Sequence, residues 1–175
     1  MAGGSDRGPE PVLETDRLLL RPWRVSEAPI QREMWAERDP RVPPHRRIDA
    51  EGLPAVMDFE EAIRSATGSS LGLLAVEPKG VGAAVGYCGL VDSGRGLQEP
   101  ELAFEFLRRS WGQGYATEAS WAVLRWATTA GYQRLWATVW DWNIASRRVL
   151  AKVGFEEAER QETPHGTNCV TTRRL

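Results

Sequence analysis

Residues 109–118, which read R-S-W-G-Q-G-Y-A-T-E, have the composition and spacing best suited to binding a charged ligand. A strand-like run at 102–107 precedes them, and an amphipathic helical pattern follows. The first turn of a helix has unpaired N–H donors and the positive end of the helix dipole, so this arrangement aims backbone donors at an anion. Gly112 and Gly114 remove side chains that would hold a phosphate away from the backbone. The stretch predicts a pyrophosphate cradle, with a simple tight turn as the alternative.

Two common phosphate-binding motifs do not fit this stretch. The dinucleotide fingerprint G-x-G-x-x-G would need glycine in place of Thr117. A P-loop would need G-K-[ST], which the chain lacks. The predicted cradle is therefore of another kind.

The composition is that of an ordinary globular domain. The chain has 175 residues, of which 42% are hydrophobic and 26% charged, which predicts a flexible tail at 1–11 and one domain at 12–175. The net charge of −2 argues against a nucleic-acid surface, so DNA is not an expected partner. The sequence has no apolar run of ~18 residues and its N-terminus lacks a secretory signal, so we expect a cytoplasmic protein without a membrane span.

The two cysteines, Cys88 and Cys169, are far apart and lie in strand-like runs. We expect two buried free thiols rather than a disulfide. Neither has a histidine near it in sequence, which leaves a cysteine nucleophile without support. The sequence also shows no metal-ligand cluster, so we expect no metal.

The remaining patterns predict an α+β (mixed α/β) domain in the order βααβββαβαββ. Ser26 is a candidate N-cap for the first helix, Gly68 ends the second, and Asn143 is a good N-cap for the last. The expected strands are 13–23, 71–77, 81–91, 101–107, 134–142, 155–160 and 169–173, and the expected helices run over 26–38, 55–66, from the cradle to 130, and over 143–153.

Four sequence blocks together resemble a known family. These are R-x-x-G-x-G at 109–114, E-T-D-R-L-L-L-R-P-W near the N-terminus, W-G-Q-G-Y-A-T-E-A, and N-I-A-S-R-R-V-L-A-K-V-G-F. The first resembles the acetyl-CoA-binding motif of the GCN5-related N-acetyltransferase (GNAT) superfamily. The other three resemble its RimJ/RimL-like branch, which acetylates N-termini of ribosomal proteins. The resemblance covers about 13–155, nearly the whole domain.

The resemblance implies a twisted mixed, mostly antiparallel sheet of about seven strands flanked by helices. Its two central parallel strands, 101–107 and 134–142, splay apart, and the pantetheine arm of CoA pairs with their free edges. The implied CoA-binding residues are Phe104, Glu105, Phe106, Arg109, Trp111, Gly112, Gln113, Gly114, Tyr115, Ala116, Thr117, Asn143 and Ser146.

The implied reaction is direct attack of a primary amine on the thioester of acetyl-CoA. A backbone N–H between Phe104 and Phe106 is the expected donor to the oxyanion. Many relatives have a tyrosine seven residues after the asparagine, where this chain has Leu150; Ser146 is the substitute of the RimJ/RimL-like branch and a candidate catalytic residue. Two alternatives stay open: a succinyl- or other acyl-CoA as donor, and a non-catalytic CoA-binding sensor.

The general base is not fixed by the sequence. Candidates are Glu101, Glu105, Glu118 and His165, although Glu118, in the first turns of the cradle helix, is better explained by a structural role. An α-amino group is already partly neutral at pH 7, so a water relay could serve as the base for an N-terminal amine.

The acceptor side has two sequence cues. Trp136, Trp140 and Trp142 either pack in the core under two helices or, for the last two, wall the acceptor slot. The rim at 37–49 is slightly basic and favours acidic or neutral acceptors or a carboxylated acyl donor. The expected partners are a CoA thioester and an amine acceptor, with a homodimer left open. The rim consists of Arg38, Arg41, Arg46 and Arg47 against Glu37, Asp39 and Asp49.

Overall fold

One mixed sheet organises the domain. The computed structural model describes residues 12–66, 72–96 and 98–175; the predicted tail at 1–11 and the predicted helix end at Gly68 lie outside them. Eight strands form the sheet in the order β1-β2-β3-β4-β5-β6-β8-β7. All neighbours are antiparallel except β5 and β6. No helix in the described part of the chain has the length and apolar character needed to cross a bilayer.

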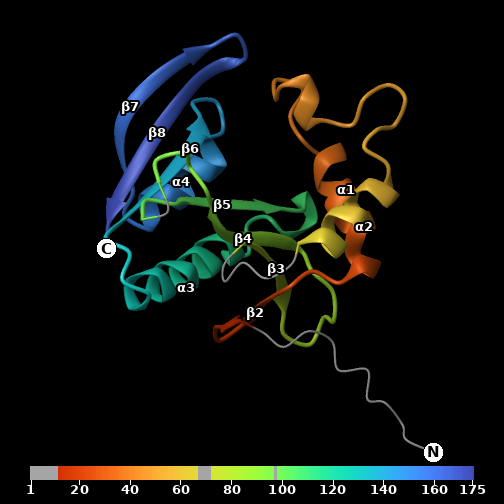
Figure 1. The fold of residues 1–175 in the computed structure, drawn as a ribbon, viewed down its shortest axis with the longest axis horizontal. Coiled ribbons are helices and arrows are strands. Elements are labelled where there is room, and N and C mark those ends of the chain that lie inside the picture. The colour runs from red at the N-terminus through yellow and green to blue at the C-terminus, as the bar shows by residue number, and fades with distance from the viewer. Residues whose placement is uncertain (1–11, 67–71, 97) are drawn as a thin grey trace, which may run out of the picture.

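The elements follow the predicted order, and Figure 1 shows α1 and α2 on one side of the sheet with α3 on the other. Short 3-10 turns precede α1, α2 and α3. The bounds are β1 Leu13–Glu14, β2 Leu18–Arg21, α1 Ala28–Ala36, α2 Val56–Ser65, β3 Leu73–Pro78, β4 Gly86–Val91, β5 Glu101–Phe106, α3 Tyr115–Thr129, β6 Arg134–Trp140, α4 Ile144–Lys152, β7 Glu156–Thr163 and β8 Gly166–Arg174.

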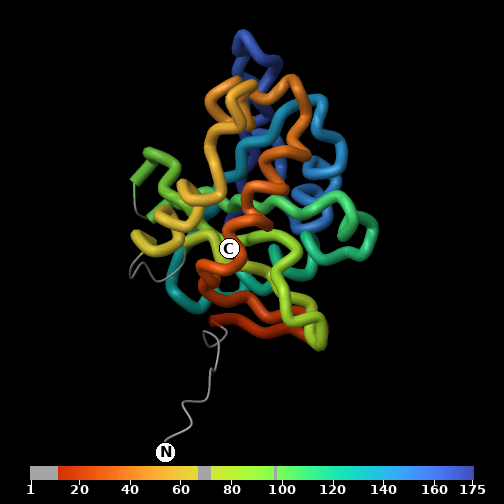
Figure 2. Tube along the Cα trace, turned by 90° about the vertical axis from the view of Figure 1, so that its right-hand side faces the viewer, coloured from red at the N-terminus to blue at the C-terminus, as the bar shows by residue number. Residues whose placement is uncertain are grey.

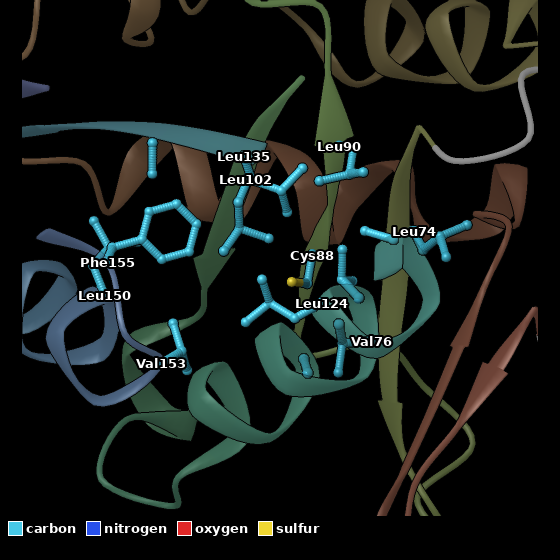
Figure 3. Packing of buried hydrophobic residues seen from close by; sticks show 14 of the residues in the cluster. Leu74, Val76, Cys88, Leu90, Leu102, Leu124, Leu135, Leu150, Val153 and Phe155 are labelled. Carbon is cyan, nitrogen blue, oxygen red and sulfur yellow. The ribbon is translucent and has the colours of Figure 1, made fainter. Parts of the chain in front are cut away.

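Strand alternation divides side chains between the two faces. The buried core lies between the sheet and α3 and α4, and Figure 3 shows Cys88, Leu102, Leu124 and Leu135 converging there. The opposite face of β4 and β5 meets α1, because Glu105 on β5 pairs with Arg38, just beyond α1. The two faces are therefore chemically different: one is apolar core and the other polar.

Two predictions about the N-terminal elements are wrong. The single strand at 13–23 is instead the hairpin β1–β2, because Thr15 N–H donates to the Leu18 carbonyl at 2.9 Å and turns the chain. The first helix is not capped by Ser26: Val25–Glu27 form a 3-10 turn, and the Glu27 carboxylate accepts the Arg24 N–H at 3.1 Å. Burying that carboxylate beside Arg21 places the helix start two residues later than predicted.

The expected separation of the parallel strands is confirmed. A single register pair, Glu101 with Trp136, joins β5 to β6. Beyond it, β5 stays paired with β4 to Phe106, and β6 stays paired with β8 to Trp140. The two central strands thus diverge while each remains held on its outer side. The last hairpin, β7–β8, is longer than predicted; Figure 2 shows it at the same end of the molecule as the segment between α1 and α2.

Candidate active site

The cradle has the backbone geometry that the glycines predict. Gly112 and Gly114 have φ of 78° and 79°, and Gly114 is the N-cap of α3. Side chains with a Cβ are strained at such angles, which explains both glycines. No described residue accepts from the backbone N–H groups of 112–117. Six consecutive donors at a helix N-terminus are therefore unpaired among the described residues, an arrangement suited to a diphosphate.

Side chains next to the cradle brace it against α1. The Arg109 guanidinium pairs with Glu33 of α1, and the Arg108 N–H donates to a carboxylate oxygen of Glu37 at 2.8 Å. Trp111 is 58% exposed, yet its indole N–H donates to the Phe106 carbonyl at 2.8 Å. These contacts fix the loop between β5 and α3 before any ligand binds.

Glu118 has the structural role that the sequence favours. Its carboxylate accepts from the Thr15 hydroxyl at 2.6 Å and from Arg17 Nε at 2.7 Å, which ties the first turn of α3 to the β1–β2 turn. Partial burial by itself would raise the pKa of Glu118, but these bonds outweigh it and leave the pKa below its ordinary value. An anchored, readily ionised carboxylate of this kind positions the cradle helix.

An open groove of about 1160 Å³ continues from the cradle along α3. Gly114 and Thr117 belong to both the cradle and the groove, and Trp121 also lines the groove. Two of its cations, Arg125 and Lys152, make no ion pair with any described residue. The groove lining thus has four cations against three carboxylates, and the two cations without an ion pair lie with an aromatic side chain next to the anion site.

The edge of β5 that faces β6 offers free backbone groups. The Pro100 carbonyl bonds β6, so by alternation the backbone groups of Phe104 and Phe106 point the same way. The Phe106 carbonyl is occupied by Trp111, whereas no described residue accepts from the Phe104 N–H. This is the stretch predicted to hold a pantetheine arm and the oxyanion.

Across the gap, α4 begins as predicted. The Asn143 side-chain oxygen accepts the Ser146 N–H at 3.1 Å, which confirms the N-cap. That bond leaves the Asn143 amide NH₂ group as a donor, and the Ser146 side chain is partly exposed in the first helical turn.

A hydrogen-bonded cluster on the polar face of β4 and β5 was not predicted. Arg38 donates to both oxygens of Glu105, at 2.8 and 2.5 Å, and the Tyr87 hydroxyl donates to Glu105 at 3.0 Å. Burial raises the pKa of the Tyr87 phenol. Strand alternation could have put Tyr87 on the face of Glu105, but only the folded chain shows that Arg38 reaches them.

The tryptophans lie on that polar face, away from α3 and α4, so they do not pack in the buried core under these two helices. Leu135, Ala137 and Val139 are the buried side of β6, and Trp136 and Trp140, which alternate with them, are half-buried on the other side. The rings of Trp140 and Trp142 stack at 6.0 Å, and Arg41 lies 4.3 Å above Trp142. An aromatic wall therefore joins β6 to the rim.

The other predicted residues are placed as follows. His165 is exposed in the β7–β8 turn and His45 in the rim. Cys88 and Cys169 are buried free thiols, as expected, and burial raises the pKa of Cys88 to about 12. Within the described residues no group of three or more histidines, cysteines or carboxylates could hold a metal.

The family follows from comparison with known proteins. A model of the acetyltransferase (GNAT) domain matches residues 17–156, so the chain belongs to the GNAT acetyltransferase family. It is an acyl-CoA-dependent N-acyltransferase, with acetyl-CoA as the acyl donor. A Bacillus subtilis relative described as an uncharacterized N-acetyltransferase, YoaA, is 24% identical, over 90% of this chain and 94% of its own.

Solved structures show the same fold. A GNAT-family acetyltransferase from Bacillus anthracis has a TM-score of 0.77 at 21% identity, covering 93% of this chain and 97% of that one. Mycobacterium smegmatis RimJ, solved with CoA-disulfide, has a TM-score of 0.73 at 20% identity, covering 95% and 86%.

Proposed function

We propose that the chain acetylates an α-amine, either of a protein N-terminus or of a small molecule, by direct attack in a ternary complex. The sequence blocks that resemble the RimJ/RimL-like branch support this choice within the family, and the fold shared with RimJ agrees with it. The amine approaches from the polar face of β5, while the thioester lies in the gap between β5 and β6.

The proposed donor site uses the free backbone groups described above. The pyrophosphate binds the N–H groups of 112–117, and the 3′-phosphate end of CoA lies in the groove by Arg125 and Lys152. The pantetheine arm pairs with the edge of β5, where the Phe104 N–H supplies the oxyanion donor. The Asn143 amide donates to the arm. The Ser146 hydroxyl passes a proton to the leaving thiolate and regains one from water that carries the proton released by the attacking amine.

The choice of an α-amine as acceptor rests on the hydrogen bonds and ion pairs that the carboxylates of the acceptor side already make. Glu105 is held by Arg38 through both oxygens, Glu101 accepts from the Thr138 N–H, and Asp39 is paired with Arg41. A carboxylate so engaged must break strong bonds to take a proton. The best acceptor is therefore an amine that is neutral without a strong base. At pH 7.4 roughly a quarter of an α-amine is neutral, against roughly a thousandth of a lysine.

A water relay, or His165 at the hairpin turn, then removes the proton after attack. His165 is exposed, and among the described residues only its backbone N–H has a hydrogen-bond partner. The rim supports an acidic or neutral acceptor, because Arg46 and Arg47 make no ion pair with the described residues, whereas Arg38 and Arg41 do.

A thiol-release assay tests the proposal. With acetyl-CoA, peptides that have a free α-amine should release CoA thiol, and N-terminally blocked peptides with an internal lysine should not. Equal release from both would refute the choice of amine. Succinyl-CoA in parallel reactions reports donor choice, and charge reversal of Arg46 and Arg47 to glutamate should raise KM for acidic peptides above that for neutral ones.

The Ser146→Ala variant tests the proton donor. We expect about a tenfold loss of kcat, since general acid assistance to a thiolate is modest. Ser26→Ala is the matched control, because Ser26 is exposed and its side chain makes no hydrogen bond within the part of the chain that the structure describes. Equal kcat in both variants would remove Ser146 from the mechanism.

A further inference from the structure

The parallel ladder between β5 and β6 stops for a local reason. The Trp136 N–H donates to the Pro100 carbonyl at 3.0 Å, as a regular parallel ladder requires. The next donor in that ladder is the Thr138 N–H, and its regular acceptor is the Leu102 carbonyl. Instead, the Thr138 N–H donates to the Glu101 side chain, Oε1, at 2.8 Å.

The strands themselves do not end at this point. β6 continues its pairing with β8 through Trp140, and β5 continues its pairing with β4 through Phe106. A carboxylate binds an N–H more strongly than a neutral carbonyl does, so the side chain outcompetes the neighbouring strand for this one donor. The interception occurs where divergence begins.

A second contact fixes the register that makes the interception work. The Trp136 indole N–H donates to Glu99 at 2.7 Å, which anchors β6 to the residues just before β5. With Trp136 held opposite Glu101, the next N–H of β6 that points toward β5 is that of Thr138. The Glu101 carboxylate, half-buried, is within reach of that donor.

We propose that Glu101 is a positioning residue that ends the β5–β6 ladder and holds the gap open for the pantetheine arm. By taking the Thr138 N–H, its carboxylate leaves the Leu102 carbonyl and the Phe104 backbone free for the ligand. Because its Oε1 is already an acceptor within the sheet, we assign Glu101 to positioning rather than to proton abstraction. This inference rests on the proposed binding of acetyl-CoA in that gap.

Three substitutions distinguish a positioning role of Glu101 from a role as general base. In Glu101→Gln the amide oxygen still accepts from Thr138, whereas Glu101→Ala removes the acceptor and Glu101→Asp shortens its reach. When the acceptor is lost, Thr138 can bond Leu102, and the ligand must then break that bond. Calorimetry should show that the Ala variant binds acetyl-CoA about tenfold more weakly, because one net hydrogen bond corresponds to a change of about that size in Kd. In the Gln variant the neutral amide oxygen loses the advantage of the charge but still reaches the Thr138 N–H, so Kd should rise by no more than about threefold, and kcat should stay within about threefold of wild type.

The outcomes are distinct. If Gln is as inactive as Ala, with Kd unchanged and one ionisation missing from the pH profile of kcat/KM, Glu101 is the base and the inference is overturned. Equal Kd in the wild type and the Ala variant also overturns it. Absence of acetyl-CoA binding in the wild type would instead refute the proposed function. Thermal unfolding verifies that each variant folds. If the Ala variant does not fold, the Asp variant replaces it in the binding measurement, and the Asp variant should show the same loss of affinity.

Discussion

Replacing Arg21 with methionine should strongly destabilise the domain. Arg21 is 1% exposed, and its guanidinium donates to Glu77 at 2.7 Å and to both oxygens of Glu27, at 2.8 and 2.6 Å. Glu27 also accepts the Ala84 N–H at 3.1 Å, so the cluster joins β2, β3 and the start of α1. The substitution leaves two buried carboxylates without their shared cation, a defect that costs about 3–5 kcal/mol.

Chemical denaturation of the wild type and of Arg21→Met measures that cost. For a domain of this size, about 4 kcal/mol corresponds to a fall in Tm of about 10 °C. Arg24→Met is the matched control: the Arg24 side chain is 32% exposed and lies 3.3 Å from Glu77, so its loss should cost about 1 kcal/mol or less. Equal losses in the two variants would refute the reasoning.

The pH dependence gives a second check on the same cluster. Burial alone would raise the pKa of Glu27, but hydrogen bonds from Arg21, Arg24 and Ala84 outweigh it and lower the pKa below its ordinary value. In the wild type this stabilisation is present above the unfolded-state pKa and is lost as the pH falls through the folded-state pKa. In Arg21→Met the unpaired carboxylates favour protonation, so the difference between variant and wild type should shrink from pH 7 to pH 5. A constant difference would contradict this assignment.

Two further predictions concern the donor site. Gly114→Ala forces a residue with a Cβ into a φ of 79°, which should cost about 1–2 kcal/mol of stability and raise KM for acetyl-CoA. Gly94→Ala, at a φ of 71° in a distant turn, is the control: it should cost similar stability and leave that KM unchanged. A raised KM in both variants would contradict the role of the cradle. Replacing Arg125 and Lys152 with glutamate should raise KM for acetyl-CoA by about fivefold per charge at low salt. KM for acetyl-dephospho-CoA, which lacks the 3′-phosphate, should not change. Equal effects on both donors would contradict the placement of the 3′-phosphate in this groove.

Much of the donor side could be predicted from sequence because its determinants are local. The conformations at Gly112 and Gly114, the Asn143 cap and the start of α3 depend on residues within one turn of each other. The order of strands and helices followed from periodicity in the same way, although the β1–β2 hairpin was missed because a turn at Thr15 has no glycine or proline to mark it.

The acceptor side was harder to predict because its contacts join distant segments. Alternation placed Trp136 and Trp140 on one face of a strand, but alternation alone cannot say which face packs against α3 and α4. The burial of Leu135, Ala137 and Val139 decided it. Similarly, the pattern of β5 put Glu101 and Glu105 on the same face without showing that each would be occupied by a different partner.

The sequence by itself determined the backbone of the cradle and the family to which the chain belongs, since both depend on residues close together along the chain. Only the tertiary structure decided how the carboxylates are used. Arg38 reaches Glu105 across 67 residues and Thr138 reaches Glu101 across 37, and such pairings are set by sheet register and helix packing rather than by neighbours in sequence.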